Sequence, residues 1–153
     1  MHIQRFTSVN FTNKLVDIIY NNFNYLKNQP GIIFSKNEIM NCLISPELLG
    51  WYLLDDNNNI TGYLIGTKKE VGDGRYVYFI DYFYIITKYR NKGMGTKMLI
   101  LCINYIKNIN IKFIMLITEI NSNAYKMYNR MGFVKEPLMT LNNPNFKILL
   151  YYN

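Results

Sequence analysis

Two hydrophobic periods alternate along the 153-residue chain, one of about two residues and one of about 3.6 residues. The shorter period predicts strands at residues 2–7, 51–54, 60–67, 76–86, 112–118 and 146–152. The longer period predicts helices that end near Lys27, Ile44, Asn108 and Met131. The pattern therefore predicts an α+β (mixed α/β) fold, with a largely antiparallel sheet and one strand–helix–strand crossover.

Polar residues and glycines mark the ends of the predicted helices. Asn10 or Thr12 is the expected N-cap of the first helix. Ser35 followed by Glu38 has the spacing of a capping box at the start of the second helix. Gly132 is expected to end the last helix, because a glycine readily adopts the left-handed conformation found there.

The long strand at residues 76–86 carries a single charged residue, Asp81. Strand alternation predicts that Tyr76, Tyr78, Ile80, Tyr82 and Tyr84 share one face of the sheet, and that Val77, Phe79, Asp81 and Phe83 share the other. Burial of a carboxylate on such a strand is costly and raises its pKa. Asp81 is therefore a candidate general base or ammonium contact, and the alternative is a structural aspartate bonded to a loop backbone.

A basic glycine loop, Arg90-Asn91-Lys92-Gly93-Met94-Gly95-Thr96, lies where this strand gives way to a helix. Its glycines let a ligand approach the backbone, and the amides at a helix N-terminus have no partner inside the helix. These features and the helix dipole favour a phosphate, with a plain glycine turn as the alternative. The dinucleotide fingerprint fails because Met98 replaces its third glycine. The Walker loop fails because Thr96-Lys97 follows Gly95.

This loop is one of two blocks with a recognisable pattern. Arg90 to Gly95 reads Arg-x-x-Gly-x-Gly, and residues 121–133 read Asn-x-x-Ala-x-x-x-Tyr-x-x-x-Gly-Phe. In this order and spacing the two blocks resemble the GNAT superfamily of acyl-CoA N-acyltransferases, whose fourth strand and pyrophosphate loop match residues 80–95. The resemblance is firm over residues 76–134 and extends to the rest of the chain in topology alone.

The resemblance implies a GNAT-like fold, a mostly antiparallel sheet of about six or seven strands flanked by about four helices, in a single N-acetyltransferase domain spanning residues 1–153. It implies transfer of the acetyl group of acetyl-CoA to a primary amine by direct attack in a ternary complex. The fourth and fifth strands are expected to splay near a bulge and to hold the coenzyme between them. The implied coenzyme-binding residues are Phe83, Tyr84, Ile85, Arg90, Asn91, Lys92, Gly93, Met94, Gly95, Thr96, Asn121 and Tyr128.

The resemblance also suggests which side chains carry the chemistry. Asp81 lies where family members often have a glutamate base, and the shorter aspartate favours a relay through water. Tyr128 matches the tyrosine that protonates the leaving thiolate, with a packing role as the alternative. Glu119, after the fifth predicted strand, is the reserve base.

Composition narrows the choice of partners. The net charge of +7 favours an anionic partner and argues against attraction of polyamines, although compositional drift is an alternative explanation of the charge. One histidine and two cysteines, Cys42 and Cys102, argue against a metal site. No secretory pattern and no apolar segment long enough for a bilayer is found, so we expect a cytoplasmic monomer or homodimer without membrane contact.

Two other functions stay open at this point. One is a GNAT-fold protein that binds acyl-CoA with little turnover. The other is a basic nucleic-acid-binding module, which is disfavoured because the basic residues are scattered and no RNA-binding motif is found.

Overall fold

The computed structural model describes all 153 residues and contains a seven-stranded sheet. Along the chain the elements are β1 (His2–Phe6), α1 (Lys14–Asn22), α2 (Lys36–Leu43), β2 (Leu48–Leu54), β3 (Ile60–Glu70), β4 (Tyr76–Ile85), α3 (Met94–Asn108), β5 (Phe113–Glu119), α4 (Asn123–Arg130), β6 (Val134–Lys135) and β7 (Phe146–Tyr152), with short 3₁₀ turns at Asn24–Asn28 and Thr87–Tyr89. The strand order is β1-β2-β3-β4-β5-β7-β6, and β4 with β5 is the one parallel pair. This architecture confirms the predicted fold class.

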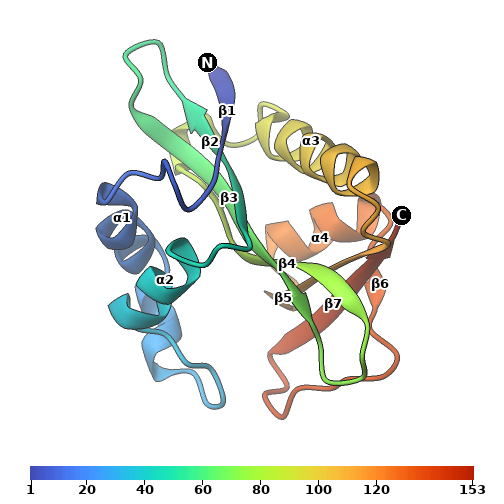
Figure 1. The fold of residues 1–153 in the computed structure, drawn as a ribbon. Coiled ribbons are helices and arrows are strands. Elements are labelled where there is room, and N and C mark those ends of the chain that lie inside the picture. The colour runs from blue at the N-terminus through green and yellow to red at the C-terminus, as the bar shows by residue number, and fades with distance from the viewer.

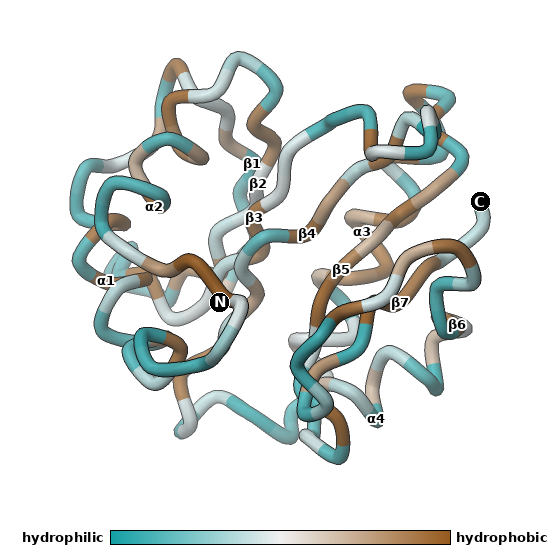
Figure 2. The backbone as a smooth tube through the Cα atoms, turned by 90° about the horizontal axis from the view of Figure 1, so that it is seen from below, coloured by the Kyte–Doolittle hydropathy of each residue, from teal (hydrophilic) through white to brown (hydrophobic).

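Helices cover both faces of the sheet, with α1 and α2 on one side and α3 and α4 on the other (Figure 1). Leu64 and Ile80 pack with Met98 of α3 in the core of one face. Tyr63 packs with Leu15 of α1 in the core of the opposite face. Hydrophobic stretches, brown in Figure 2, run along the central strands between the two groups of helices. The alternation of side chains along each strand therefore supplies a hydrophobic core on each face of the sheet.

The predicted N-caps of the first helix are wrong. Asn10 accepts a hydrogen bond from a main-chain amide of the preceding turn (2.8 Å), and the amide of Thr12 donates to a tyrosine hydroxyl (3.0 Å). Both residues therefore belong to the connection before α1, whose N-cap is Asn13. The helix ends at Asn22 rather than near Lys27, because the asparagines around its last turn are poor helix formers.

The other predicted helix ends are confirmed. Ser35 Oγ accepts a hydrogen bond from the amide of Glu38 (3.1 Å) at the start of α2. Gly132 follows α4 with φ +99°. The one strand missed was β6, whose two residues are too few to show an alternation.

A bulge at Asp81 corrects the predicted faces of β4. Ile65 of β3 pairs with Tyr82, but the next residue of β3 pairs with Ile80, so Asp81 has no partner. One extra residue reverses the alternation beyond it. Ile80 therefore lies in the core under α3, whereas Tyr82 and Tyr84 pack on the side of α1 and α2. Phe83, predicted to share a face with Asp81, packs instead against the core under α3.

Candidate active site

Strands β4 and β5 separate half-way along their length. They pair in parallel over Val77–Ile80 and Phe113–Leu116. Beyond this ladder β4 continues to Ile85 and β5 to Glu119 without pairing to each other. A cavity of about 1600 Å³ lies here, lined by both strand ends, α4 and the loop before α3. This volume exceeds the range of about 300–1,000 Å³ typical of single-ligand pockets, so the cavity has room for two substrates.

The loop before α3 presents free main-chain amides to this cavity. The amide nitrogens of residues 91 through 96 donate no hydrogen bond within the chain, and the first helical bond is from Lys97 to the carbonyl of Gly93 (3.0 Å). Asn91 and Gly93 have positive φ angles of 60° and 77°, which turn successive amides inward. The amides and the positive end of α3 form a cradle for an anion.

Most of the predicted coenzyme-binding residues line the cavity. The lining includes Phe83, Tyr84, Ile85, Arg90, Asn91, Gly93, Met94, Gly95, Thr96 and Tyr128. The side chains of Lys92 and Asn121 are not part of it, although Lys92 contributes a free amide. Arg90 is occupied within the protein, since its Nε donates to the carbonyl of Ile85 (2.6 Å) and its guanidinium lies 4.9 Å from the Tyr84 ring centroid. Arg90 therefore fixes the loop to the end of β4.

Asp81 projects from the bulge toward α2. Its Oδ2 accepts hydrogen bonds from Thr67 Oγ1 (3.0 Å) and Cys42 Sγ (3.6 Å), and Lys69 Nζ lies 3.8 Å from Oδ1. Burial raises the pKa of the Asp81 carboxyl, and these neighbours offset only part of that rise. The side chain is 19% exposed and lines the cavity. Asp81 is thus a carboxylate with enhanced basicity that opens onto the separated strands.

Tyr128 reaches the same cavity from the opposite face of the sheet. Its ring packs at 6.4 Å from Phe83 and 5.4 Å from Phe133, and the residue is 5% exposed. Burial raises the pKa of the Tyr128 hydroxyl, which keeps it protonated. The hydroxyl makes no side-chain hydrogen bond and is not a buried group without a partner, so it opens onto the cavity that Tyr128 lines. Its proton is therefore free for a bound molecule.

Glu119 lies at the end of β5 and also lines the cavity. It is close to Tyr25, since burial and the nearby Glu119 carboxylate both raise the pKa of the Tyr25 hydroxyl. Glu119 is exposed to solvent, unlike Asp81. The two carboxylates therefore offer the cavity a shielded proton acceptor and a solvated one.

Comparison with known proteins identifies the family. A protein-family model described as "Acetyltransferase (GNAT) family" matches residues 15–133. The chain belongs to the GNAT acetyltransferase family. It is therefore an acyltransferase that uses acetyl-CoA as its acetyl donor, as the resemblance implied. No curated protein sequence matches it significantly.

Solved structures share the fold of this acetyltransferase at low sequence identity. Arabidopsis thaliana NAA60 in complex with a bisubstrate analogue is 13% identical, with a TM-score of 0.70 over 99% of this chain and 98% of that one. The NatC complex bound to Gag peptide and CoA is 20% identical, with a TM-score of 0.73 over 100% and 99%. The ribosomal-protein-S18-alanine N-acetyltransferase of Escherichia coli is 12% identical, with a TM-score of 0.67 over 99% and 94%.

The cavity of the acetyltransferase fits its co-substrate. The free amides of the loop suit a diphosphate, and the unpaired edge of β4 suits the amide groups of pantetheine.

None of the helices is both long and apolar enough to cross a membrane.

The far end of the cavity is enclosed by two segments that the sequence motifs did not indicate. They are residues 29–35, between α1 and α2, and the β6–β7 loop (residues 136–145). The Nδ2 of Asn143 donates to the carbonyl of Pro30 (3.1 Å) and joins them. Both residues line the cavity, and Figure 1 shows the two segments at the same edge of the molecule. We call this region the α2 end of the cavity.

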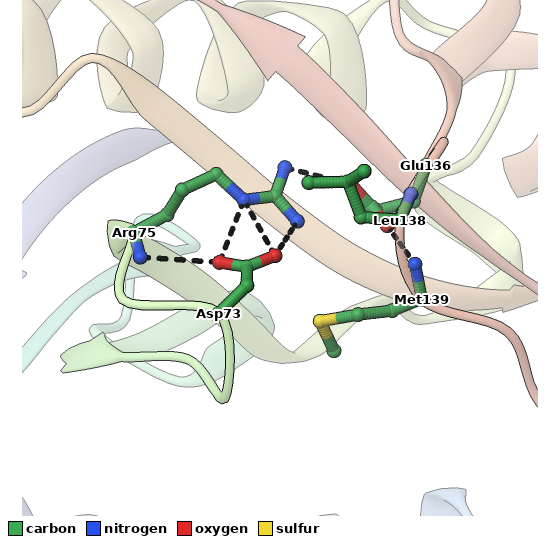
Figure 3. A network of polar contacts seen from close by, with 5 residues as sticks. All are labelled: Asp73, Arg75, Glu136, Leu138 and Met139. Atoms are coloured by element: carbon green, nitrogen blue, oxygen red, sulfur yellow. Dashed lines mark hydrogen bonds and ion pairs between the residues drawn. The ribbon is translucent and has the colours of Figure 1, made fainter.

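A buried carboxylate anchors the β6–β7 loop (Figure 3). The fully buried Glu136 side chain accepts hydrogen bonds from the amides of Leu138 (2.7 Å) and Met139. Its Oε1 pairs with Arg75 Nη1 (2.6 Å), and Asp73 pairs with the same guanidinium (2.6 Å). Burial alone would raise the pKa of Glu136, but Arg75 and the two amides hold it below its usual value. Through Arg75, the β3–β4 hairpin thus fixes the β6–β7 loop, which forms one wall of the α2 end of the cavity.

Replacing Gly93 with alanine is expected to weaken acetyl-CoA binding. A Cβ there meets nothing within 4 Å, but φ is +77°, which costs an L-residue about 1–2 kcal/mol. Relaxation of that strain reorients the free amides, so calorimetry should show a dissociation constant raised about tenfold. Gly31→Ala is the matched control, because φ is +76° and the space is also empty. Equal acetyl-CoA affinity in the two variants would contradict a role for the loop.

Proposed function

We propose that residues 1–153 form a single N-acetyltransferase domain that transfers the acetyl group to a primary amine by direct attack in a ternary complex. The observation that supports this proposal most is the placement of Asp81 and Tyr128 on one cavity, which also contains the loop with free amides. A bound acetyl-CoA supplies a thioester, and an amine can attack it without a covalent enzyme intermediate.

Asp81 is the proposed base. Its raised pKa favours uptake of the proton that the acceptor ammonium must lose, directly or through one water. Main-chain groups on the edge of β4 that is not paired to β5, around Phe83, position the donor and polarise the carbonyl that is attacked. Tyr128 donates its hydroxyl proton to the leaving sulfur and is reprotonated by the second proton that the attacking nitrogen loses as the amide forms. Glu119 is the alternative base, and its solvated position makes it the weaker candidate.

The proposed acceptor enters at the α2 end of the cavity. One of the similar structures, the NatC complex, is bound to a Gag peptide, and another is an N-acetyltransferase named for an alanine of ribosomal protein S18. A peptide α-amine therefore belongs on any acceptor panel, beside small amines and lysine side chains. The panel distinguishes an enzyme from a protein that binds acyl-CoA with little turnover.

The test is amine-dependent release of coenzyme A thiol by the wild type and by Tyr128→Phe. We expect release with at least one amine, and a kcat about 10- to 100-fold lower in the variant. The loss is moderate because a thiolate, with a pKa of about 8.5, leaves readily without an acid. Stability should be unchanged, because the Tyr128 hydroxyl opens onto the cavity and makes no side-chain hydrogen bond. Tyr151→Phe serves as an aromatic control outside the cavity. Acetyl-CoA binding without thiol release for any amine would refute the proposal.

A further inference from the structure

Lys69 places an ammonium group beside the proposed base, and neither the fold nor the coenzyme site accounts for it. Lys69 lies two residues after Thr67 on β3, so both side chains point to the face that Asp81 occupies. Its Nζ is 3.8 Å from Asp81 Oδ1, too far for a hydrogen bond, and 4.4 Å from the Phe79 ring centroid. The side chain is 43% exposed and lines the cavity. Its N–H donors are therefore accessible to a molecule bound in the cavity beside Asp81.

The two oxygens of Asp81 are not equivalent. Thr67 and Cys42 both donate to Oδ2, which leaves this oxygen committed to the protein. Both hydrogen bonds to the carboxylate thus leave Oδ1 without a donor, and Lys69 Nζ lies 3.8 Å from it. An acceptor ammonium is therefore expected to bind Oδ1, where it comes close to a second positive charge.

This arrangement disfavours a plain cation and favours an acceptor with its own negative charge. The repulsion from Lys69 opposes binding of a simple alkylammonium. An anionic group on the acceptor removes that penalty by pairing with Lys69. The neighbouring Lys68 does not compete for it, because its Nζ is paired with Glu47 (3.3 Å), and Arg90 is bonded to the end of β4.

We propose that Lys69 forms a subsite for an anionic group of the acceptor, so that the preferred substrates are primary amines with a carboxylate close to the nitrogen. The proposal rests on the function proposed above. With about 1.5 Å per covalent bond, a spacing of about one to three carbon atoms lets a single molecule span Asp81 and Lys69. Free amino acids and peptides with an acidic first residue share this chemistry.

The test compares acceptors of equal size that differ in charge. The pairs are β-alanine with β-alanine amide, and Asp-Ala-Ala amide with Asn-Ala-Ala amide, which separate a free amino acid from a peptide terminus. One of the two pairs contains the kind of acceptor that the enzyme uses, a free amino acid or a peptide terminus. With that pair, the kcat/KM of the wild type should be about tenfold higher for the anionic member than for the neutral one. Lys69→Gln should abolish this preference, measured as the ratio of kcat/KM for the two members of a pair, because a change at Asp81 itself affects both members alike. Lys68→Gln should retain the preference.

The outcomes distinguish a failure of the Lys69 subsite from a failure of the proposed acetyltransferase function. Thiol release without a charge preference, or a preference that survives in Lys69→Gln, overturns the subsite and leaves the acetyltransferase intact. Absence of thiol release with every amine overturns both. Because Lys69 is exposed, Lys69→Gln is expected to fold, and its thermal unfolding midpoint should match that of Lys68→Gln.

Discussion

Asp81→Asn is expected to lower kcat/KM for acetyl transfer by about 100- to 1,000-fold, the lower part of the range typical of a positioned base. Asparagine keeps an acceptor for Thr67 and Cys42, so the variant should retain the fold and the acetyl-CoA site. Steady-state thiol release and calorimetry with acetyl-CoA measure the two properties separately. The loss should appear in turnover and not in the affinity for acetyl-CoA.

The pH dependence gives this prediction a second readout. Burial raises the pKa of Asp81, so the wild-type rate should rise with pH through that elevated value, as the carboxyl loses its proton. Asp81→Asn should lack this limb. Glu119→Gln is the matched control, and it should retain both rate and limb. If Glu119→Gln loses activity and Asp81→Asn does not, the base is Glu119.

The same raised pKa makes Asp81 a cost to stability. A carboxyl whose pKa is higher in the folded state than in the unfolded chain destabilises the fold when the pH is above its usual pKa of 3.8. This cost disappears when the pH is below 3.8. Asp81→Asn should therefore be as stable as wild type or more stable at neutral pH, with no such difference at pH 3. A residue that costs stability on a strand and opens onto a cavity is typical of a functional site.

The loop and helix that form the candidate coenzyme site could be predicted as structure from the sequence because their signals are local. Gly93, with its positive φ, and the free amides after it follow from a glycine at a helix start. Tyr128 was found by its spacing from two motif positions. The helix cap at Ser35 likewise depends on residues three apart.

The surroundings of Asp81 could not be predicted because they come from three separate elements. Thr67 and Lys69 lie on β3, Cys42 on α2 and Asp81 on β4. Their contacts depend on the pairing of β3 with β4 and on a bulge for which an uninterrupted apolar strand gives no warning. The bulge also explains why the predicted faces fail beyond Ile80. Thus local structure was predictable, and the geometry that joins segments distant in sequence was not.

Arg75→Met is expected to lower the free energy of unfolding at neutral pH by about 3 kcal/mol. This is near the lower end of the losses typical of breaking a buried ion pair, because the guanidinium is close to the surface. The variant leaves Glu136 Oε1 buried without any partner. Urea denaturation measures the loss. Without Arg75, burial raises the pKa of Glu136, so the deficit should shrink as the pH is lowered through 4.5, its usual value.

The double variant Arg75→Met/Glu136→Gln should recover much of this stability. The glutamine carbonyl can still accept from the amides of Leu138 and Met139, and no buried charge remains. Asp73→Asn is the control for loss of the outer partner, and it should have a smaller effect since Asp73 is partly exposed. Because Glu136 holds the β6–β7 loop, Arg75→Met should also raise KM for the amine while the dissociation constant for acetyl-CoA stays the same. An equal loss of affinity for both substrates would mean that the ion pair supports the whole fold and not the acceptor wall in particular.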